Sequence, residues 1–336
     1  MMSAAKGVKG LWSFLAATWL AMKRQQTLVR LPDISPWKWA LLLLALTLVY
    51  QIGVLHLDNR LYFWIKTSWH ESEWENRSLW LPEYQVRIDA LPVAGVSNNL
   101  SGLTYDEGRD QLWAVVNNPE ELLALSKDGE LLARYPLSGF SDVEGITYLG
   151  DNLLLLAEER DQALVVVELP KKPGALFRED YRALTLGIAA GGNKGFEGVG
   201  YDRAGDRLYV VKEHSPRKLY EVRGLKSSFL GNFNLEVIDR QAWIEHKVFA
   251  TDLSSVHYDE QTGHLALLSD ESKVLIELDA EDGKLISFRS LLSGFAGLKD
   301  SVPQGEGITL DDQGNLYLVS EPNLFYRFER ESRPGA

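Results

Sequence analysis

The stretch Glu144-Gly145-Ile146-Thr147-Tyr148 decides the fold, because related versions of it return along the chain. The other four are Ser101-Gly102-Leu103-Thr104-Tyr105, Glu197-Gly198-Val199-Gly200-Tyr201, Ser254-Ser255-Val256-His257-Tyr258 and Glu306-Gly307-Ile308-Thr309-Leu310. Their first residues are separated by 43, 53, 57 and 52 positions. Each version is followed by a turn rich in Asp, Gly and Asn and then by a short apolar run. A period of about 40 to 50 residues built from short strands is typical of a β-propeller, so five copies predict five blades.

Each repeat has the pattern of four short strands. In the first repeat these are residues 100–105, 112–117, 121–125 and 130–137, with glycine-containing hairpin turns. In the third repeat, an insertion over residues 223–245 precedes the expected fourth strand. The fifth repeat ends after its third strand, and the strand-like residues 84–91 can supply the fourth, which closes the ring and removes a sheet edge. The sequence therefore predicts an all-β, five-bladed β-propeller over residues 84–330, followed by a tail over residues 331–336.

An uncharged run before the propeller predicts a membrane span. Residues 39–55 carry no charged side chain, and extension to residues 37–57 reaches the length of a helix that crosses the hydrocarbon core. The first 57 residues hold six Lys or Arg against one Asp, and basic flanks stay in the cytoplasm. We therefore expect a cytoplasmic basic segment over residues 1–36, an N-terminal transmembrane helix over residues 37–57, a juxtamembrane linker over residues 58–83, and a propeller outside the cytoplasm.

Two other interpretations of the uncharged run compete with a membrane anchor. A cleavable signal peptide is disfavoured because His56-Leu57-Asp58-Asn59-Arg60 offers no small-residue cleavage site. A buried core helix is disfavoured because the run stands outside every repeat. A second apolar stretch, residues 11–22, is too short to span a bilayer. It fits an interfacial helix, or else translation begins at Met22.

Composition excludes several classes of function. The net charge is −12 and the acidic residues lie mainly in the propeller, whereas binding to phosphate groups needs clustered Lys and Arg. Nucleic acid is therefore not expected as a partner. The chain has no cysteine, which excludes disulfides and thiolate sites. It also shows no G-x-S-x-G elbow and no phosphate-binding glycine loop between a strand and a helix.

Polar residues at one rim of the propeller form the candidate site. The first and second strands of a blade are antiparallel, so the start of one and the end of the other lie at the same rim. Three glutamates open first strands, while four acids and one amide end second strands. They are Glu144, Glu197 and Glu306, then Glu158, Glu213, Asp270 and Glu321, with Asn117. This placement brings seven carboxylates and one amide to one end of the axis.

Such a concentration of like charges requires compensation. Protonation, pairing with Lys or Arg, or a bound cation would each provide it. An all-oxygen donor set favours a hard cation such as Ca²⁺ over Zn²⁺, and Ca²⁺ tolerates irregular geometry. The competing interpretation is that the acids cap strand ends by accepting backbone N–H bonds. His214, which follows Glu213 at the rim, and Asn117 are the candidate ligand-binding residues, and His214 is also the best candidate for a base.

Three motifs resemble a known family. Asn-Lys-Gly-Phe-Glu-Gly (193–198), Leu-Ser-Asp-Glu-Ser (268–272) and Val-Ser-Glu-Pro-Asn-Leu-Phe-Tyr-Arg-Phe (319–328) are similar to the bacterial SdiA-regulated family, distant kin of NHL-repeat propellers. The resemblance covers residues 84–330. It implies a five-bladed propeller, a bound calcium ion, and an N-terminal membrane or export segment in Gram-negative bacteria, and no established activity. The family's Glu-Gly repeats match at Glu144, Glu197 and Glu306, whereas Ser101 and Ser254 depart from them. Metal ligands are therefore expected mainly from the other three blades.

These features predict a single-pass protein of the bacterial inner membrane. Its periplasmic propeller would bind Ca²⁺ at one mouth of the central channel and recognise a small ligand or a protein partner there. The alternative is a metal-dependent hydrolase of the phosphodiesterase or lactonase type, because some related propellers use a calcium-bound Glu with Asn or Asp in such chemistry. A third interpretation is a scaffold whose ion only holds the blades together. Because one fold hosts many functions, the fold does not decide among the three, and whether the protein is an enzyme stays open.

Overall fold

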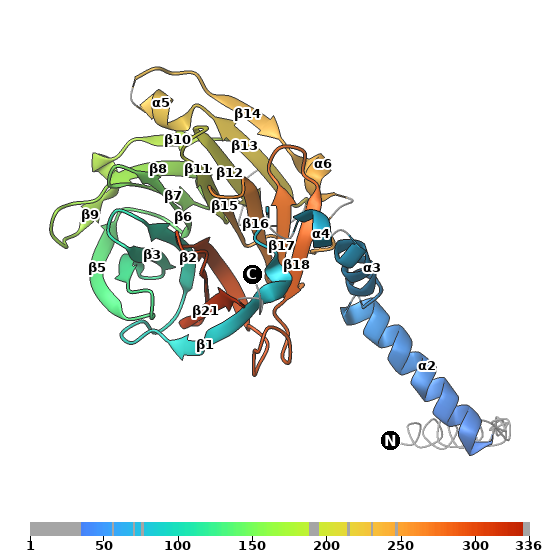
Figure 1. The fold of residues 1–336 in the computed structure, drawn as a ribbon. Coiled ribbons are helices and arrows are strands. Elements are labelled where there is room, and N and C mark those ends of the chain that lie inside the picture. Colours follow the sequence, from blue (N-terminus) through green and yellow to red (C-terminus); the bar gives the residue numbers. More distant parts are fainter. Residues whose placement is uncertain are drawn as a thin grey trace, which may run out of the picture. The chain divides into compact units, whose positions relative to one another are not determined.

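Five antiparallel sheets stand around a common axis in the part of the chain that the structure describes (Figure 1). This computed structural model describes residues 35–331 apart from 56, 70, 75–76, 188–194, 214–215, 230 and 246–247. Each sheet forms one blade, and the five-bladed propeller predicted from the repeats is confirmed.

The blades follow the order of the repeats, and each contains four antiparallel strands. Blade 1 contains β2 (Leu100–Asp106), β3 (Gln111–Asn117), β4 (Glu120–Leu125) and β5 (Leu131–Ser138). Blade 2 contains β6 (Val143–Gly150), β7 (Leu153–Glu158), β8 (Ala163–Glu168) and β10 (Ala183–Thr185). Blade 3 contains β11 (Val199–Asp202), β12 (Arg207–Lys212), β13 (Lys218–Arg223) and β14 (Glu236–Asp239). Blade 4 contains β15 (Ser255–Asp259), β16 (His264–Ser269), β17 (Val274–Asp279) and β18 (Leu285–Ser290). Blade 5 contains β19 (Gln304–Leu310), β20 (Leu316–Glu321), β21 (Leu324–Arg330) and β1 (Tyr84–Pro92).

The ring closes through strands from opposite ends of the propeller. The strand β1 pairs antiparallel with β21, from Tyr84 opposite Arg330 to Pro92 opposite Leu324. This confirms the prediction that residues 84–91 supply the strand that the fifth repeat lacks. Closure in this way gives β21 a hydrogen-bonding partner on each side, so that β21 is not an exposed sheet edge.

Two segments differ from the expected strand pattern. The fourth strand of blade 3, β14, lies inside the insertion over residues 223–245 and not after it. A short strand that the repeats did not predict, β9 (Leu176–Phe177), pairs parallel with β5 and widens blade 1. Both lie at the outer side of their blades, where strands no longer follow the repeated pattern.

The apolar core lies between neighbouring blades. Five clusters of buried apolar side chains each join two adjacent blades, so blade 5 packs on blade 1 as blade 1 packs on blade 2. All six residues of β16 are buried, which explains why such strands are continuously apolar in the sequence and do not alternate. Each fully buried Leu contributes about 2 kcal/mol through the hydrophobic effect.

The repeated glycine allows the innermost strands to approach one another. A Cβ atom added at Gly145 would lie 2.3 Å from the carbonyl oxygen of Glu197 in blade 3, and one at Gly307 would lie 2.6 Å from the Leu103 nitrogen in blade 1. Blade 4 has Ser255 at this position, and its hydroxyl accepts a 3.3 Å hydrogen bond from the Ile308 N–H. The glycines therefore allow the innermost strands of neighbouring blades to pack closely around the axis, and this explains their place in the repeat.

The described residues also form five helices and two 3₁₀ turns outside the strands. The helices are α2 (Pro36–Leu55), α3 (Leu57–Trp69), α4 (Glu71–Trp74), α5 (Leu225–Phe229) and α6 (Gln241–Ile244), with 3₁₀ turns η1 (Leu81–Glu83) and η2 (Arg178–Asp180). The chain separates into two units, Met1–Leu57 and Asp58–Ala336. Among the helices that the structure describes, none is long and apolar enough to cross a membrane. The predicted span over residues 37–57 is not confirmed and stays a prediction. Residues 1–34 of the predicted basic segment (1–36), the second apolar stretch (11–22) and residues 332–336 of the predicted tail lie outside the described residues.

Candidate metal centre

The strand register places the predicted carboxylates at one rim. In blade 2, Val143 at the start of the innermost strand pairs with Glu158 at the end of the next strand. In blade 5, Gln304 and Glu321 pair in the same way. The residues that open the first strands and those that end the second strands therefore share one mouth of the channel.

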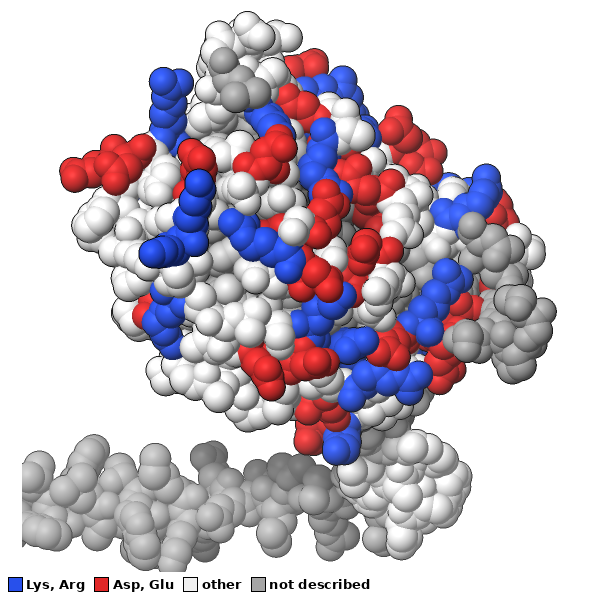
Figure 2. All heavy atoms as spheres, turned by 60° about the vertical axis from the view of Figure 1, so that its left-hand side comes forward, with Lys and Arg blue, Asp and Glu red and all other residues white. Residues whose placement is uncertain are grey.

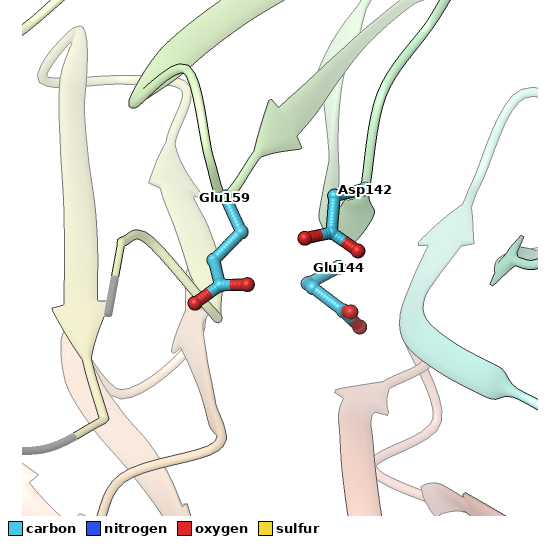
Figure 3. Close-up of side chains that lie close together, drawn as sticks. All are labelled: Asp142, Glu144 and Glu159. Carbon is cyan, nitrogen blue, oxygen red and sulfur yellow. The ribbon is translucent and has the colours of Figure 1, made fainter. Parts of the chain in front are cut away.

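Three carboxylates form the tightest group at this mouth. One oxygen of each of Asp142, Glu144 and Glu159 lies within 4.8 Å of the others. Figure 3 shows the Asp142 and Glu144 carboxylates one above the other, with the Glu159 carboxylate to one side of them. Glu159 is buried, while Asp142 and Glu144 are half-buried. Of these three, only Glu144 was predicted as a site residue. Asp142 lies two positions before Glu144, and Glu159 directly follows the predicted Glu158.

Glu197 and Glu306 extend this group through their charges. Burial is the largest cause that raises the pKa of Glu197 well above its usual value, and the charges of Glu144, Glu159, Glu213 and Glu306 add to it. Burial also raises the pKa of Glu306 well above normal, with contributions from Glu144, Asp270 and Glu321 in the same direction. The three glutamates of the repeats thus act on one another electrostatically, as their position in the sequence predicts.

Glu144 accepts hydrogen bonds through its side chain from neighbouring residues at the mouth. Burial raises its pKa to about 7, although hydrogen bonds from Asn117 and Ser101 oppose the shift. The Asn117 side-chain amide donates to Glu144 Oε1. The negative charge of a desolvated carboxylate can be stabilised by a proton or by a bound cation. A carboxyl with a pKa near neutrality can therefore exchange its proton for a cation.

Two buried oxygens beside Glu144 lack ordinary hydrogen bonds. Asn117 Oδ1 and Ser101 Oγ have no partner of normal geometry within the described part of the chain. The Ser101 hydroxyl is nevertheless near enough to Glu144 to lower its pKa. A buried polar atom without a partner costs about 1–3 kcal/mol, and Asn117 Oδ1, unlike the Ser101 hydroxyl, has no such interaction with Glu144.

Two of the predicted acids are engaged elsewhere. Glu158 accepts hydrogen bonds from the Ser141 N–H at 3.2 Å and from Arg178 Nε at 2.9 Å. Asp270 Oδ1 lies 2.5 Å from Lys273 Nζ and accepts a 2.9 Å bond from the Gly305 N–H. The backbone N–H contacts match the competing interpretation of the sequence, in which the acids cap strand ends, and the contacts with Arg178 and Lys273 match compensation by basic side chains.

The last predicted residues lie at the edges of the group. Burial and then the charge of Asp270 raise the pKa of Glu321. Glu213 is described and contributes to the field at Glu197. His214 lies outside the described residues. In blade 4, Ser254 Oγ donates a 2.7 Å bond to the Gly305 carbonyl, so this position is used for contact between blades.

The donor set of this arrangement suits a small hard cation. Its donors are carboxylate and amide oxygens from several blades, which match the preference of Ca²⁺ for many oxygen ligands in flexible geometry. On the face shown in Figure 2, Lys and Arg side chains are interspersed with Asp and Glu and form no continuous basic surface.

Comparison with known proteins gives a family and several distant structural likenesses. The family model described as SdiA-regulated matches residues 76–329. Among solved structures, the chain is similar to glutaminyl cyclase of Myxococcus xanthus (TM-score 0.49, 12% identity, 73% of this chain and 95% of that chain). It is also similar to a streptogramin B lyase (TM-score 0.43, 9% identity, 74% and 98%) and to a chain of a nidogen/laminin complex (TM-score 0.43, 12% identity, 67% and 73%).

Proposed function

This chain belongs to the SdiA-regulated family, and we propose that its propeller is a binding module that holds Ca²⁺ at the carboxylate-lined mouth. A ligand or partner would be recognised at the same mouth. The ion would neutralise the clustered acids and offer a positive centre to oxygen atoms of the bound molecule. Glu144, Asp142 and Glu159 would supply charged ligands, and Asn117 would supply a neutral one.

The observation that carries this proposal is the pair of features around Glu144. Its oxygen lies within 4.8 Å of carboxylate oxygens of Asp142 and Glu159, and the buried Asn117 Oδ1 beside it finds no partner among the described residues. Carboxylates alone are common at strand ends. A buried amide oxygen without a donor is not, and a cation would satisfy it together with the acids.

Calorimetric titration of the full chain with Ca²⁺ tests the proposal. We expect saturable binding that Asn117→Leu weakens at least tenfold, because the amide oxygen is lost without a change in charge. Glu281→Gln is the control, since Glu281 pairs with Arg207 in blade 3 and its side chain is 78% exposed. Absence of Ca²⁺ binding in the wild type, or equal binding by Asn117→Leu and wild type, would contradict the proposal.

We further propose that residues 37–57 anchor the protein in the bacterial inner membrane with the propeller in the periplasm. The support is the uncharged run over residues 39–55 and the basic residues before it. A reporter that is active only outside the cytoplasm, fused after Leu57, should be active. A reporter active only in the cytoplasm should be inactive at the same position, and the reverse result would contradict the topology.

A further inference from the structure

The helix α3 (Leu57–Trp69) exposes most of its large apolar side chains. The exposed fractions are 57% for Leu61, 59% for Tyr62, 59% for Trp64, 36% for Ile65 and 81% for Trp69. In the described part of the propeller, exposed large apolar residues are scattered singly, which is normal for a soluble surface. Five exposed large apolar side chains within nine residues of one helix are more than the scattered exposure of an ordinary surface, even though the exposed Ser68 lies among them.

The exposed side chains share one side of the helix. At 100° per residue, Leu61, Tyr62, Trp64, Ile65 and Trp69 fall within about 160° of the helix circumference. Thr67 falls outside this arc and is 5% exposed, with its hydroxyl donating to the Trp64 carbonyl. The apolar side of α3 is therefore turned outward, while a polar residue is buried. This is the reverse of an ordinary amphipathic helix that packs on its own domain.

We propose that α3 lies in the interfacial layer of a phospholipid bilayer, with this apolar side toward the acyl chains. The proposal rests on the membrane anchor proposed above. Residues 37–57 would end at the bilayer surface, and α3 begins where they end, so the helix starts at the depth of the headgroups. A bilayer is then the apolar phase that the helix meets first.

The residue types identify lipid as the occupant of this surface. Trp and Tyr contribute three of the five exposed side chains, and these residues favour the interface because a large apolar ring carries one polar group. A helix with a wide apolar side and 13 residues lies along the interface and does not cross the bilayer. The linker would thus hold the propeller close to the membrane.

Site-directed spin labelling tests the proposal cleanly, because the chain contains no cysteine. The full chain would be reconstituted in vesicles of phosphatidylethanolamine and phosphatidylglycerol, with single substitutions Leu61→Cys or Trp69→Cys carrying a nitroxide. We expect both labels to be relaxed more strongly by oxygen than by a water-soluble nickel chelate. Gly174→Cys is the aqueous control, because nothing lies within 4 Å of a Cβ atom there. Leu44→Cys in α2 is the control for the anchor.

The controls separate failure of this proposal from failure of the anchor. A label at position 44 in lipid, with labels at positions 61 and 69 as accessible to nickel as that at position 174, would overturn the interfacial helix alone. Labels at positions 61 and 69 shielded from both oxygen and nickel would also overturn it, because protein would then cover the apolar side. A label at position 44 that is accessible to nickel would overturn both proposals.

Discussion

The buried carboxylate of Glu277 in blade 4 accepts a 2.8 Å hydrogen bond from the backbone N–H of Leu79, 198 positions earlier in the chain. The Trp80 N–H at 3.1 Å and the Ser287 hydroxyl at 2.5 Å donate to its other oxygen. His264 Nδ1 lies 2.8 Å from the first oxygen. One side chain thus fastens the segment before the propeller to blade 4, a few residues before the closing strand β1 begins at Tyr84.

Loss of this carboxylate should destabilise the protein strongly. Glu277→Ala leaves the N–H groups of Leu79 and Trp80 buried without acceptors, and we expect a loss of about 3 kcal/mol in the free energy of unfolding. Denaturant unfolding followed by tryptophan fluorescence measures it. Glu281→Ala, at an exposed carboxylate that pairs with Arg207, should cost less than about 1 kcal/mol. Equal losses in the two variants would show that the buried carboxylate does not hold the segment.

The close approach of neighbouring blades makes a second prediction. In Gly145→Ala the new Cβ atom would lie 2.3 Å from the Glu197 carbonyl oxygen, so the innermost strand of blade 3 must move. We expect a loss of about 1–3 kcal/mol, as is usual for overpacking, and weaker Ca²⁺ binding because Glu197 moves with its strand. Gly174→Ala is the matched control, with open space around it, and should change stability by less than about 0.5 kcal/mol. Gly145→Ala that unfolds at the same denaturant concentration as Gly174→Ala would contradict this account.

Ring closure makes a third prediction. Deletion of residues 84–92 from the full chain removes β1, exposes the edge of β21 and uncovers the core around Tyr84, which is 3% exposed. We expect aggregation or a loss of most of the unfolding free energy, measured by light scattering and thermal denaturation. Arg87→Ala within the same strand removes only an exposed ion pair with Glu329 and should leave both nearly unchanged. A deletion variant that stays monomeric and melts like wild type would refute the role of β1.

The blades were predictable from sequence because the features that define them are local. The glycines at positions such as 145 and 307 are required by contact with the next blade, so four of the five repeats carry a glycine at this position. The strand β14 was misplaced because nothing in an outer strand must touch the next blade closely. Its residues are mostly exposed, and a strand of that kind leaves a weak pattern.

The candidate site was only partly predictable, because two adjacent acids, Glu158 and Glu159, lie where the strand β7 ends. Successive side chains of a strand point to opposite faces. Glu158 therefore bonds Arg178, while Glu159 joins Asp142 and Glu144. Alternation alone names two candidates and does not choose between them. The choice depends on Arg178, which reaches Glu158 from a segment outside the repeat.

Calcium should stabilise the native state. An ion that binds only the folded protein adds RT ln(1 + [L]/Kd), or about 2.7 kcal/mol at one hundred times Kd, so the melting temperature should rise with Ca²⁺ and rise less with Mg²⁺. Glu197→Gln should abolish most of this rise. In chelator the same variant should be at least as stable as wild type, since it relieves the repulsion that raises the Glu197 pKa after burial. If Ca²⁺ does not change the melting temperature of the wild type, the acids bind no ion and serve only to cap strand ends.

The pH dependence without metal gives the last prediction. The folded pKa of Glu144 is about 7 against an ordinary value of 4.5, so the unfolded chain ionises first as pH rises. Stability should therefore be highest below about pH 4.5 with respect to this group and should fall as pH approaches 7, by about 3 kcal/mol in total. The raised pKa values of Glu197 and Glu306 act in the same direction.

Calcium should reverse this trend, because the ion binds the ionised carboxylates and competes with protons. The increase in melting temperature caused by Ca²⁺ should therefore be larger at pH 8 than at pH 5. Glu144→Gln cannot ionise, so in chelator its melting temperature should fall less steeply between pH 5 and pH 8 than that of the wild type. Glu281→Gln should keep the full slope, since Glu281 lies on the surface by Arg207. Parallel pH profiles for Glu144→Gln and the wild type in chelator would show that Glu144 is ionised in the folded protein without a cation, and the need for a bound ion at this mouth would disappear.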